Sequence, residues 1–124
     1  LVEVKHRDII CKAIEYLKRN CRDRVTLEDT AGHVGLSPSY FSRVFKEEVG
    51  ESFNSYLTAL RISRGRAMLL DTDASIAEIC DRCGFDDQSY FTKVFRKYTG
   101  VTPGRFRARR GRPENGEEPG RKQA

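Results

Sequence analysis

The side chains best suited to metal binding or catalysis in this sequence are its thiols and imidazoles. Cys80 and Cys83 form a CxxC pair, a spacing found in zinc sites and in redox disulfides. A zinc site needs a second pair of ligands, and neither His6 nor His33 has an acid or a nucleophile arranged around it. We therefore expect no catalytic residues, no metal and no cofactor. The lack of a Gly-rich phosphate loop or paired carboxylates also argues against an enzyme.

Basic side chains are the second source of chemistry, and they are concentrated in the C-terminal third. The 124 residues include 23 Lys or Arg and 18 Asp or Glu, which gives a formal net charge of +5. From Arg82 to Arg110 there are eight basic residues and only two acids, Asp86 and Asp87. This local excess suits an anionic partner.

Two amphipathic patterns predict long helices that could position these side chains. The first lies at roughly 6–20, where apolar residues recur at the i, i+3, i+4 and i+7 spacing: Ile10, Ala13, Ile14 and Leu17. The second lies over 52–71 and is marked by Phe53, Tyr56, Leu57, Leu60 and Ala67.

No apolar run approaches the length of about 18 residues needed for a membrane span, and no signal peptide is evident. We expect a soluble cytoplasmic protein without membrane contact. Because the chain does not begin with Met, we expect it to be part of a longer protein.

Two shorter helices are expected between these long ones. Thr26 can cap a helix over 27–34, which Gly35 can end in a left-handed conformation. Ser37 can cap the next helix, over 38–50, which has a proline at its first position. Two short helices joined by a glycine-containing turn are typical of a helix-turn-helix unit.

The same pattern is repeated farther along the chain. The offset is 49 residues up to the turn, from Gly35 to Gly84, and 50 residues beyond it, from Phe41 to Phe91. The second turn therefore carries one extra residue. A duplication this regular predicts two helix-turn-helix subdomains.

The repeat also bears on the CxxC pair. It aligns Cys80 with Ala31 and Cys83 with Val34, two small or apolar helix-packing positions. Packing is therefore favoured for both thiols, and a thiol- or metal-responsive sensor remains an alternative.

Residues 75–80, 84–91, 94–96 and 99–103 closely resemble the signature of the AraC/XylS family of bacterial transcription regulators. The resemblance covers roughly 6–108. It implies an all-α, seven-helix, homeodomain-like domain, with two helix-turn-helix subdomains joined by a long central helix. Gly65 and Cys80 stand where the family usually has alanine.

Domain boundaries follow from the resemblance and the composition together. We expect the end of an upstream linker over 1–5, and a first helix-turn-helix subdomain over 6–51. The central connecting helix is expected over 52–71 and the second subdomain over 72–110. The Gly-, Pro- and Glu-rich residues 111–124 are expected to be a disordered tail.

The resemblance also implies which side chains face DNA. Matching the family's recognition helices residue by residue gives candidate base contacts at Ser39, Ser42, Arg43, Gln88, Ser89, Thr92 and Lys93. Chemistry favours Arg43 for guanine, Gln88 for adenine, and Lys93 for guanine or a phosphate. Candidate phosphate contacts are Ser37, Lys46, Arg61, Arg96, Arg105 and Arg107.

Each of these assignments has a plainer alternative. Arg43 could be solvated or ion-paired, and Gln88 could only support the start of its helix. Tyr40 and Tyr90 adjoin the expected core residues Phe41 and Phe91, so packing is favoured over base stacking for both.

The function expected on these grounds is sequence-specific binding of double-stranded DNA, with two recognition helices in successive major grooves of an asymmetric site. Family members often activate transcription through RNA polymerase. They usually carry an upstream sensor or dimerisation domain, so both partners are implied here. The alternatives are non-specific architectural DNA binding, in which charge alone supplies affinity, and a sensor acting through Cys80 and Cys83.

Overall fold

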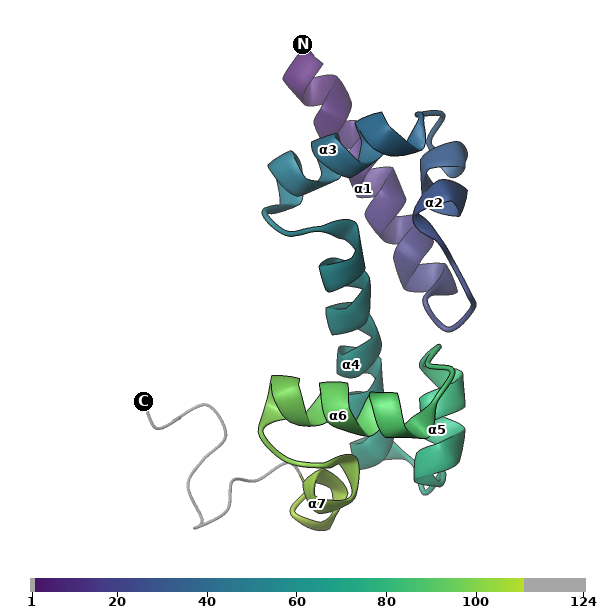
Figure 1. Cartoon of the computed structure of the whole chain (residues 1–124), viewed down its shortest axis with the longest axis vertical. Coiled ribbons are helices and arrows are strands. Elements are labelled where there is room, and N and C mark those ends of the chain that lie inside the picture. Colours follow the sequence, from purple (N-terminus) through teal and green to yellow (C-terminus); the bar gives the residue numbers. More distant parts are fainter. Residues whose placement is uncertain (1, 111–124) are drawn as a thin grey trace. The chain divides into compact units, whose positions relative to one another are not determined.

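Seven α-helices make up the secondary structure of residues 2–110, the part of the chain that the computed structural model describes (Figure 1). They are α1 (Val2–Asn20), α2 (Leu27–His33), α3 (Pro38–Val49), α4 (Phe53–Asp71), α5 (Ile76–Arg82), α6 (Gln88–Thr99) and α7 (Pro103–Ala108). The expected all-α class and the number of helices are confirmed. The tail predicted over 111–124 lies outside the described residues.

The first helix begins earlier than the sequence pattern indicates. α1 starts at Val2, whereas the apolar spacing predicted a start near residue 6 and a linker over 1–5. Residues 2–5 are therefore helical. They extend the helix beyond the periodic apolar stripe from which the start was predicted.

Polar caps set the starts of the short helices at the predicted positions. Thr26 Oγ1 accepts a hydrogen bond from the backbone NH of Asp29, and the Asp29 carboxylate accepts one from the NH of Thr26. Ser75 and Glu78 form the same reciprocal pair at the start of α5. Ser37 caps α3 ahead of a proline at its first position. Each cap satisfies NH groups that the first turn leaves without a helical partner.

The turn within each helix-turn-helix has the same backbone geometry. Gly35 and Gly84 have φ angles of 78° and 95°, a region that residues with a Cβ adopt rarely. After each glycine the chain reaches back to the preceding helix, with Leu36 NH donating to Ala31 O at 2.9 Å. Phe85 NH donates to Cys80 O at 3.0 Å in the second copy. The two turns that the sequence repeat aligns therefore share the same backbone hydrogen bond.

The chain divides into two compact units, with the boundary inside α4, between Arg61 and Ile62. The expected central helix over 52–71 is one helix, and each half of it belongs to a different unit. In the first unit, Phe41, Phe45 and Phe53 form a cluster of ring contacts with centroids 5.7–5.9 Å apart. These rings join α3 to the first half of α4.

The second unit has an aromatic core at matching positions of α6. Phe91 and Phe95 are fully buried, and their ring centroids lie 5.7 Å apart. Phe106 of α7 packs on Phe95 at 5.3 Å, while Phe85, in the turn before α6, packs on Phe91 at 5.1 Å. This core fixes the orientation of α6 within its unit.

Gly65 lies where α4 packs closely on the core of the second unit. A Cβ at this position would lie 3.3 Å from two ring atoms of Phe91 and 3.4 Å from Cys83 Sγ. Because Phe91 is fully buried, its ring has little room to move. The glycine that departs from the family pattern is thus matched to a crowded site.

Gly65→Ala is therefore expected to gain none of the roughly 1 kcal/mol that alanine normally adds in a helix interior. Overpacking should leave the free energy of unfolding unchanged or lower it by about 1 kcal/mol. Gly104 of α7 has nothing within 4 Å of a built Cβ, so Gly104→Ala is the matched control and should not destabilise. Urea denaturation of both variants measures the difference. A clear stabilisation by Gly65→Ala would contradict this account.

Candidate nucleic-acid interface

Helices α3 and α6, which match the family's recognition helices, bury the same three positions. Their other positions are exposed or half-buried, and they differ at one place, where Tyr40 is half-buried and the equivalent Tyr90 is exposed. Phe41, Val44 and Phe45 face the core in α3, as Phe91, Val94 and Phe95 do in α6. This spacing of i, i+3 and i+4 confines the apolar side chains to one stripe of each helix. The opposite side is left for polar residues.

The outward side of α3 carries four of the predicted side chains. Ser39, Arg43 and Lys46 are exposed and Ser42 is half-buried. They follow the i, i+3, i+4 and i+7 spacing, so they share one face of the helix. The structure thus brings together every base-contact candidate predicted in the first unit.

The outward side of α6 repeats this arrangement with different residues. Ser89, Lys93 and Arg96 are exposed and Thr92 is half-buried. Gln88 is exposed at the first position of the helix, and a surface hollow is lined by Gln88, Ser89 and Thr92. Amide and hydroxyl groups around one hollow can donate to and accept from base edges.

Asp87 is a site feature that the sequence reasoning missed. Its carboxylate caps α6 by accepting a hydrogen bond from the backbone NH of Ser89 at 3.1 Å. The offset between the repeats contained the signal, because the jump from 49 to 50 inserts Asp86 into the second turn and aligns Asp87 with the cap Ser37. Gln88 therefore follows the cap and is not itself the cap.

Ser37 was predicted to contact phosphate, and in the structure its Oγ accepts a hydrogen bond from Tyr40 NH at 3.4 Å. The hydroxyl hydrogen can still donate while the oxygen accepts. Phosphate contact by Ser37 stays a prediction.

Arg43 makes two side-chain contacts on its own helix. Its Nη1 lies 3.7 Å from the Glu47 carboxylate, and its Cζ lies 5.1 Å from the centroid of the Tyr40 ring. The Arg43 side chain nevertheless remains 61% exposed. The guanidinium is therefore restrained without being removed from the surface.

The charge around the two recognition helices differs in balance. Residues 88–110 contain seven basic side chains and no acidic one: Lys93, Arg96, Lys97, Arg105, Arg107, Arg109 and Arg110. Residues 38–61 contain three basic side chains, Arg43, Lys46 and Arg61, and three acidic ones, Glu47, Glu48 and Glu51. The positive potential is therefore stronger around α6 than around α3.

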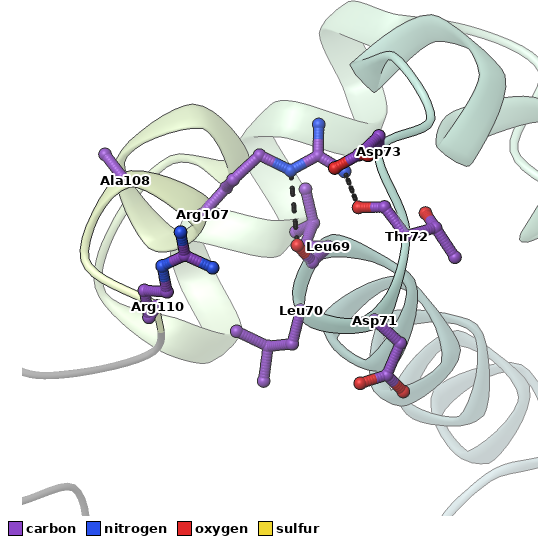
Figure 2. A pocket seen from close by; sticks show the side chains of 8 residues that line it. All are labelled: Leu69, Leu70, Asp71, Thr72, Asp73, Arg107, Ala108 and Arg110. Carbon is purple, nitrogen blue, oxygen red and sulfur yellow. Dashed lines mark hydrogen bonds between the residues drawn. The ribbon is translucent and has the colours of Figure 1, made fainter.

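Arg61 and Arg107, both predicted to contact phosphate, donate to backbone carbonyls in the structure. Arg61 binds the chain just after α1, with Nε 2.8 Å from Cys21 O and Nη2 2.9 Å from Asp23 O. Arg107 binds the end of α4, with Nε 3.2 Å from Leu69 O and Nη2 2.9 Å from Thr72 O, as Figure 2 shows. We call these two arrangements the guanidinium clamps.

The guanidinium clamps bind carbonyl groups at or just after the C-terminal end of a helix, and they place a cation at the negative end of the helix dipole. A structural role thus competes with the predicted phosphate role for both arginines. Their phosphate contacts remain predictions.

Cys80 and Cys83 are buried thiols in the core of the second unit. The Cys80 thiol donates to Phe85 O at 3.7 Å. Burial is the main cause that raises the pKa of Cys80, and the charges of Asp87, Asp81 and Asp86 add to the shift. A buried thiol with a raised pKa is a poor nucleophile and a poor metal ligand at neutral pH. These contacts agree with the packing role expected from the repeat.

Two further features are absent from the part of the chain that the structure describes. Within residues 2–110, no helix is long and apolar enough to cross a membrane. Over the same residues, no three His, Cys, Asp or Glu side chains are grouped so as to hold a metal ion.

Comparison with known proteins places this arrangement in a family. The helix-turn-helix domain family matches residues 30–109. Regulatory protein PocR of Salmonella typhimurium strain LT2 is 42% identical over 102 residues, which make up 82% of this chain and 34% of PocR. The arabinose operon regulatory protein of Escherichia coli K12 is 39% identical over 98 residues, or 78% of this chain and 34% of that protein. The chain thus spans about a third of the length of these two relatives.

A solved structure shares the fold over nearly the whole chain. The C-terminal domain of AraT, a response regulator from Geobacillus stearothermophilus, has a TM-score of 0.79 and 33% identity, covering 94% of this chain and 96% of that chain. By name these relatives are regulatory proteins or, in the solved structure, a domain of a response regulator. The chain belongs to the AraC/XylS family, and it is a DNA-binding helix-turn-helix domain of a bacterial transcription regulator.

Proposed function

We propose that this domain reads one asymmetric DNA site, with α3 and α6 inserted into successive major grooves. The observation that carries this proposal is the pair of outward faces on the two recognition helices. They have the same spacing and burial but different side chains, with serines and Arg43 on one and Gln88, Thr92 and Lys93 on the other. Because the two faces present different side chains at the same positions, each is expected to select a different half-site.

The base contacts in this proposal divide by chemistry. Arg43 offers a planar pair of donors that matches guanine O6 and N7, and the Gln88 amide matches adenine N6 and N7. Lys93 reaches guanine as a point charge, and hydroxyl groups add weaker contacts from Ser39, Ser42, Ser89 and Thr92. Phosphate contacts come from Ser37, Lys46, Arg96 and Arg105, while Arg61 and Arg107 act through the guanidinium clamps.

The partners of the whole regulator belong to the same proposal. PocR and the arabinose operon regulatory protein are about three times as long as the parts this chain matches. We therefore propose that the whole regulator carries a sensor or dimerisation domain in addition to this one. From the family resemblance we also propose that it acts in the cytoplasm and contacts RNA polymerase.

Selection of binding sites from a randomised duplex pool, followed by fluorescence anisotropy titration, tests the proposal. The selected sequence should contain two unlike motifs about one helical turn apart. Specific binders commonly prefer their site over random DNA by more than about 10³. Arg43→Ala and Gln88→Ala should each lower discrimination by about tenfold at one base pair, and the two base pairs should lie in different motifs.

Lys12→Ala is a suitable control, because Lys12 is exposed on α1 and belongs to neither outward face. It removes one positive charge and should leave base discrimination unchanged. A selected-to-random ratio near one for the wild-type chain would instead establish architectural binding. The sensor alternative would be established if thiol oxidation changed the ratio of affinities for selected and random DNA, and if a Cys80→Ser/Cys83→Ser variant lost this response.

A further inference from the structure

The two recognition helices differ in how firmly they hold the basic residue at the centre of the outward face. In α3 this residue is Arg43, which lies between the Tyr40 ring and the Glu47 carboxylate. The repeat places Tyr90, Lys93 and Lys97 at the three equivalent positions of α6. Lysine beside lysine cannot form the carboxylate pair that Arg43 makes.

Tyr40 is itself fixed by the rest of the first unit. Its hydroxyl lies 2.6 Å from His6 Nε2 of α1, and the two rings meet edge to face with centroids 5.7 Å apart. The ring also packs against the buried core of this unit. Tyr90 by contrast is 53% exposed. The aromatic surface offered to Arg43 is therefore part of a rigid element.

The position of Tyr40 matters for the direction in which Arg43 points. Side chains on a helix lean towards its N-terminus, so a residue contacts its neighbour three positions earlier. Contact with Tyr40 directs the guanidinium towards the start of α3, the end of a recognition helix that reaches base edges. Contact with Glu47 alone would direct it towards the other end.

We propose that Tyr40, held by His6, is a positioning residue that sets the specificity of the first half-site by holding the Arg43 guanidinium in orientation for guanine. This inference rests on the proposed function and adds a residue that does not itself touch DNA. A long arginine side chain has many rotamers, and restraining them before binding reduces the entropy lost in making a two-point contact. At the equivalent position of α6, Lys93 has no corresponding restraint by a half-buried ring and a carboxylate.

A double-mutant cycle tests the proposal with fluorescein-labelled duplexes: the selected site, and the same site with the base pair sensitive to Arg43→Ala replaced. Tyr40→Leu should lower the preference for the selected duplex by about two- to fivefold, the range of an exposed cation–π contact. In the Arg43→Ala background, Tyr40→Leu should have no further effect on this preference. The salt dependence of binding should not change, because no phosphate contact is lost.

Tyr40→Phe keeps the ring and removes the hydroxyl, so it is the variant with the least risk to the fold. It should lower the preference clearly less than Tyr40→Leu does, and a loss as large as that of Tyr40→Leu would overturn the role assigned to the ring. Tyr90→Leu is the matched substitution in α6, and it should leave the preference at the first half-site unchanged.

In the free protein, NMR signals of the Arg43 side-chain protons should show a ring-current shift that Tyr40→Phe retains.

The outcomes separate this inference from the function on which it rests. If Tyr40→Leu lowers the preference equally with and without Arg43, or not at all while Arg43→Ala does, the positioning role is wrong and the half-site assignment stands. If the wild-type chain does not distinguish selected from random DNA, the proposed function itself is wrong.

Discussion

Replacing Arg107 with alanine is expected to destabilise the second unit by about 2 kcal/mol while leaving the salt dependence of DNA binding unchanged. The stability loss follows because Leu69 O and Thr72 O would lose a charged donor at the end of α4. In a unit of this size, such a loss lowers the unfolding midpoint by roughly 10 °C. Thermal unfolding followed by circular dichroism measures the first effect. Titration of affinity against salt concentration measures the second.

Two comparison variants make this result decisive. Arg107→Lys keeps the positive charge but cannot reach two carbonyls with one planar group, so it should lose most of the same stability. Arg96→Ala removes an exposed cation from the outward face of α6, and it should reduce the salt slope by about one with little change in stability. The reverse pattern, with Arg107→Ala altering the slope and not the midpoint, would make Arg107 a phosphate contact and not a clamp.

The guanidinium clamps mark one limit of prediction from sequence. Arg61 and Arg107 are 46 positions apart, so they do not occupy equivalent places in a repeat with offsets of 49 and 50. Yet each binds one carbonyl at an equivalent place, because Asp23 and Thr72 are 49 positions apart, whereas their other acceptors, Cys21 and Leu69, are 48 apart. Hydrogen bonds that link residues 35 to 40 positions apart depend on tertiary packing, and local patterns do not contain that information.

Local chemistry, by contrast, was sufficient to predict most of the helices. A serine or threonine followed three residues later by an acid forms a capping box from hydrogen bonds within four residues. Thr26 and its repeat Ser75 could therefore be recognised from the sequence as helix starts. The glycine at each turn was equally readable, because its φ angle restricts the choice of residue. The early start of α1 could not be read this way, because residues 2–5 lie outside the apolar periodicity.

The candidate site was predicted as a set of positions but not as a set of contacts. Helical spacing places Ser39, Ser42 and Arg43 on one face, whatever lies around them. The contact between Arg43 and Tyr40 has the local i, i+3 spacing, but the contact of Tyr40 with His6 of α1 could not be anticipated, because it depends on tertiary packing. Tyr40 was assigned to packing alone, and the structure adds the contact with the guanidinium.

The largest loss of stability is expected from Phe95→Ala, at about 3–5 kcal/mol in the second unit. Phe95 is fully buried and contacts both Phe91 and Phe106, so its ring connects α6 to α7. Small domains are stable by only about 5–15 kcal/mol, and a unit of this size lies near the lower limit. Much of the second unit should therefore be unfolded at 37 °C.

Because the proposed site is read in two parts, unfolding one unit should remove one part and not both. Phe95→Ala should abolish the preference for the motif read by Gln88 and leave the motif read by Arg43 detectable at low salt, where weaker complexes survive. Nuclear magnetic resonance spectra should lose the dispersed signals of α6 while keeping those of α3. Phe45→Ala, the equivalent substitution in the first unit, is the matched control and should produce the opposite loss. If either variant eliminated both preferences together, the two units would fold and bind as one, and the bipartite reading of the site would be wrong.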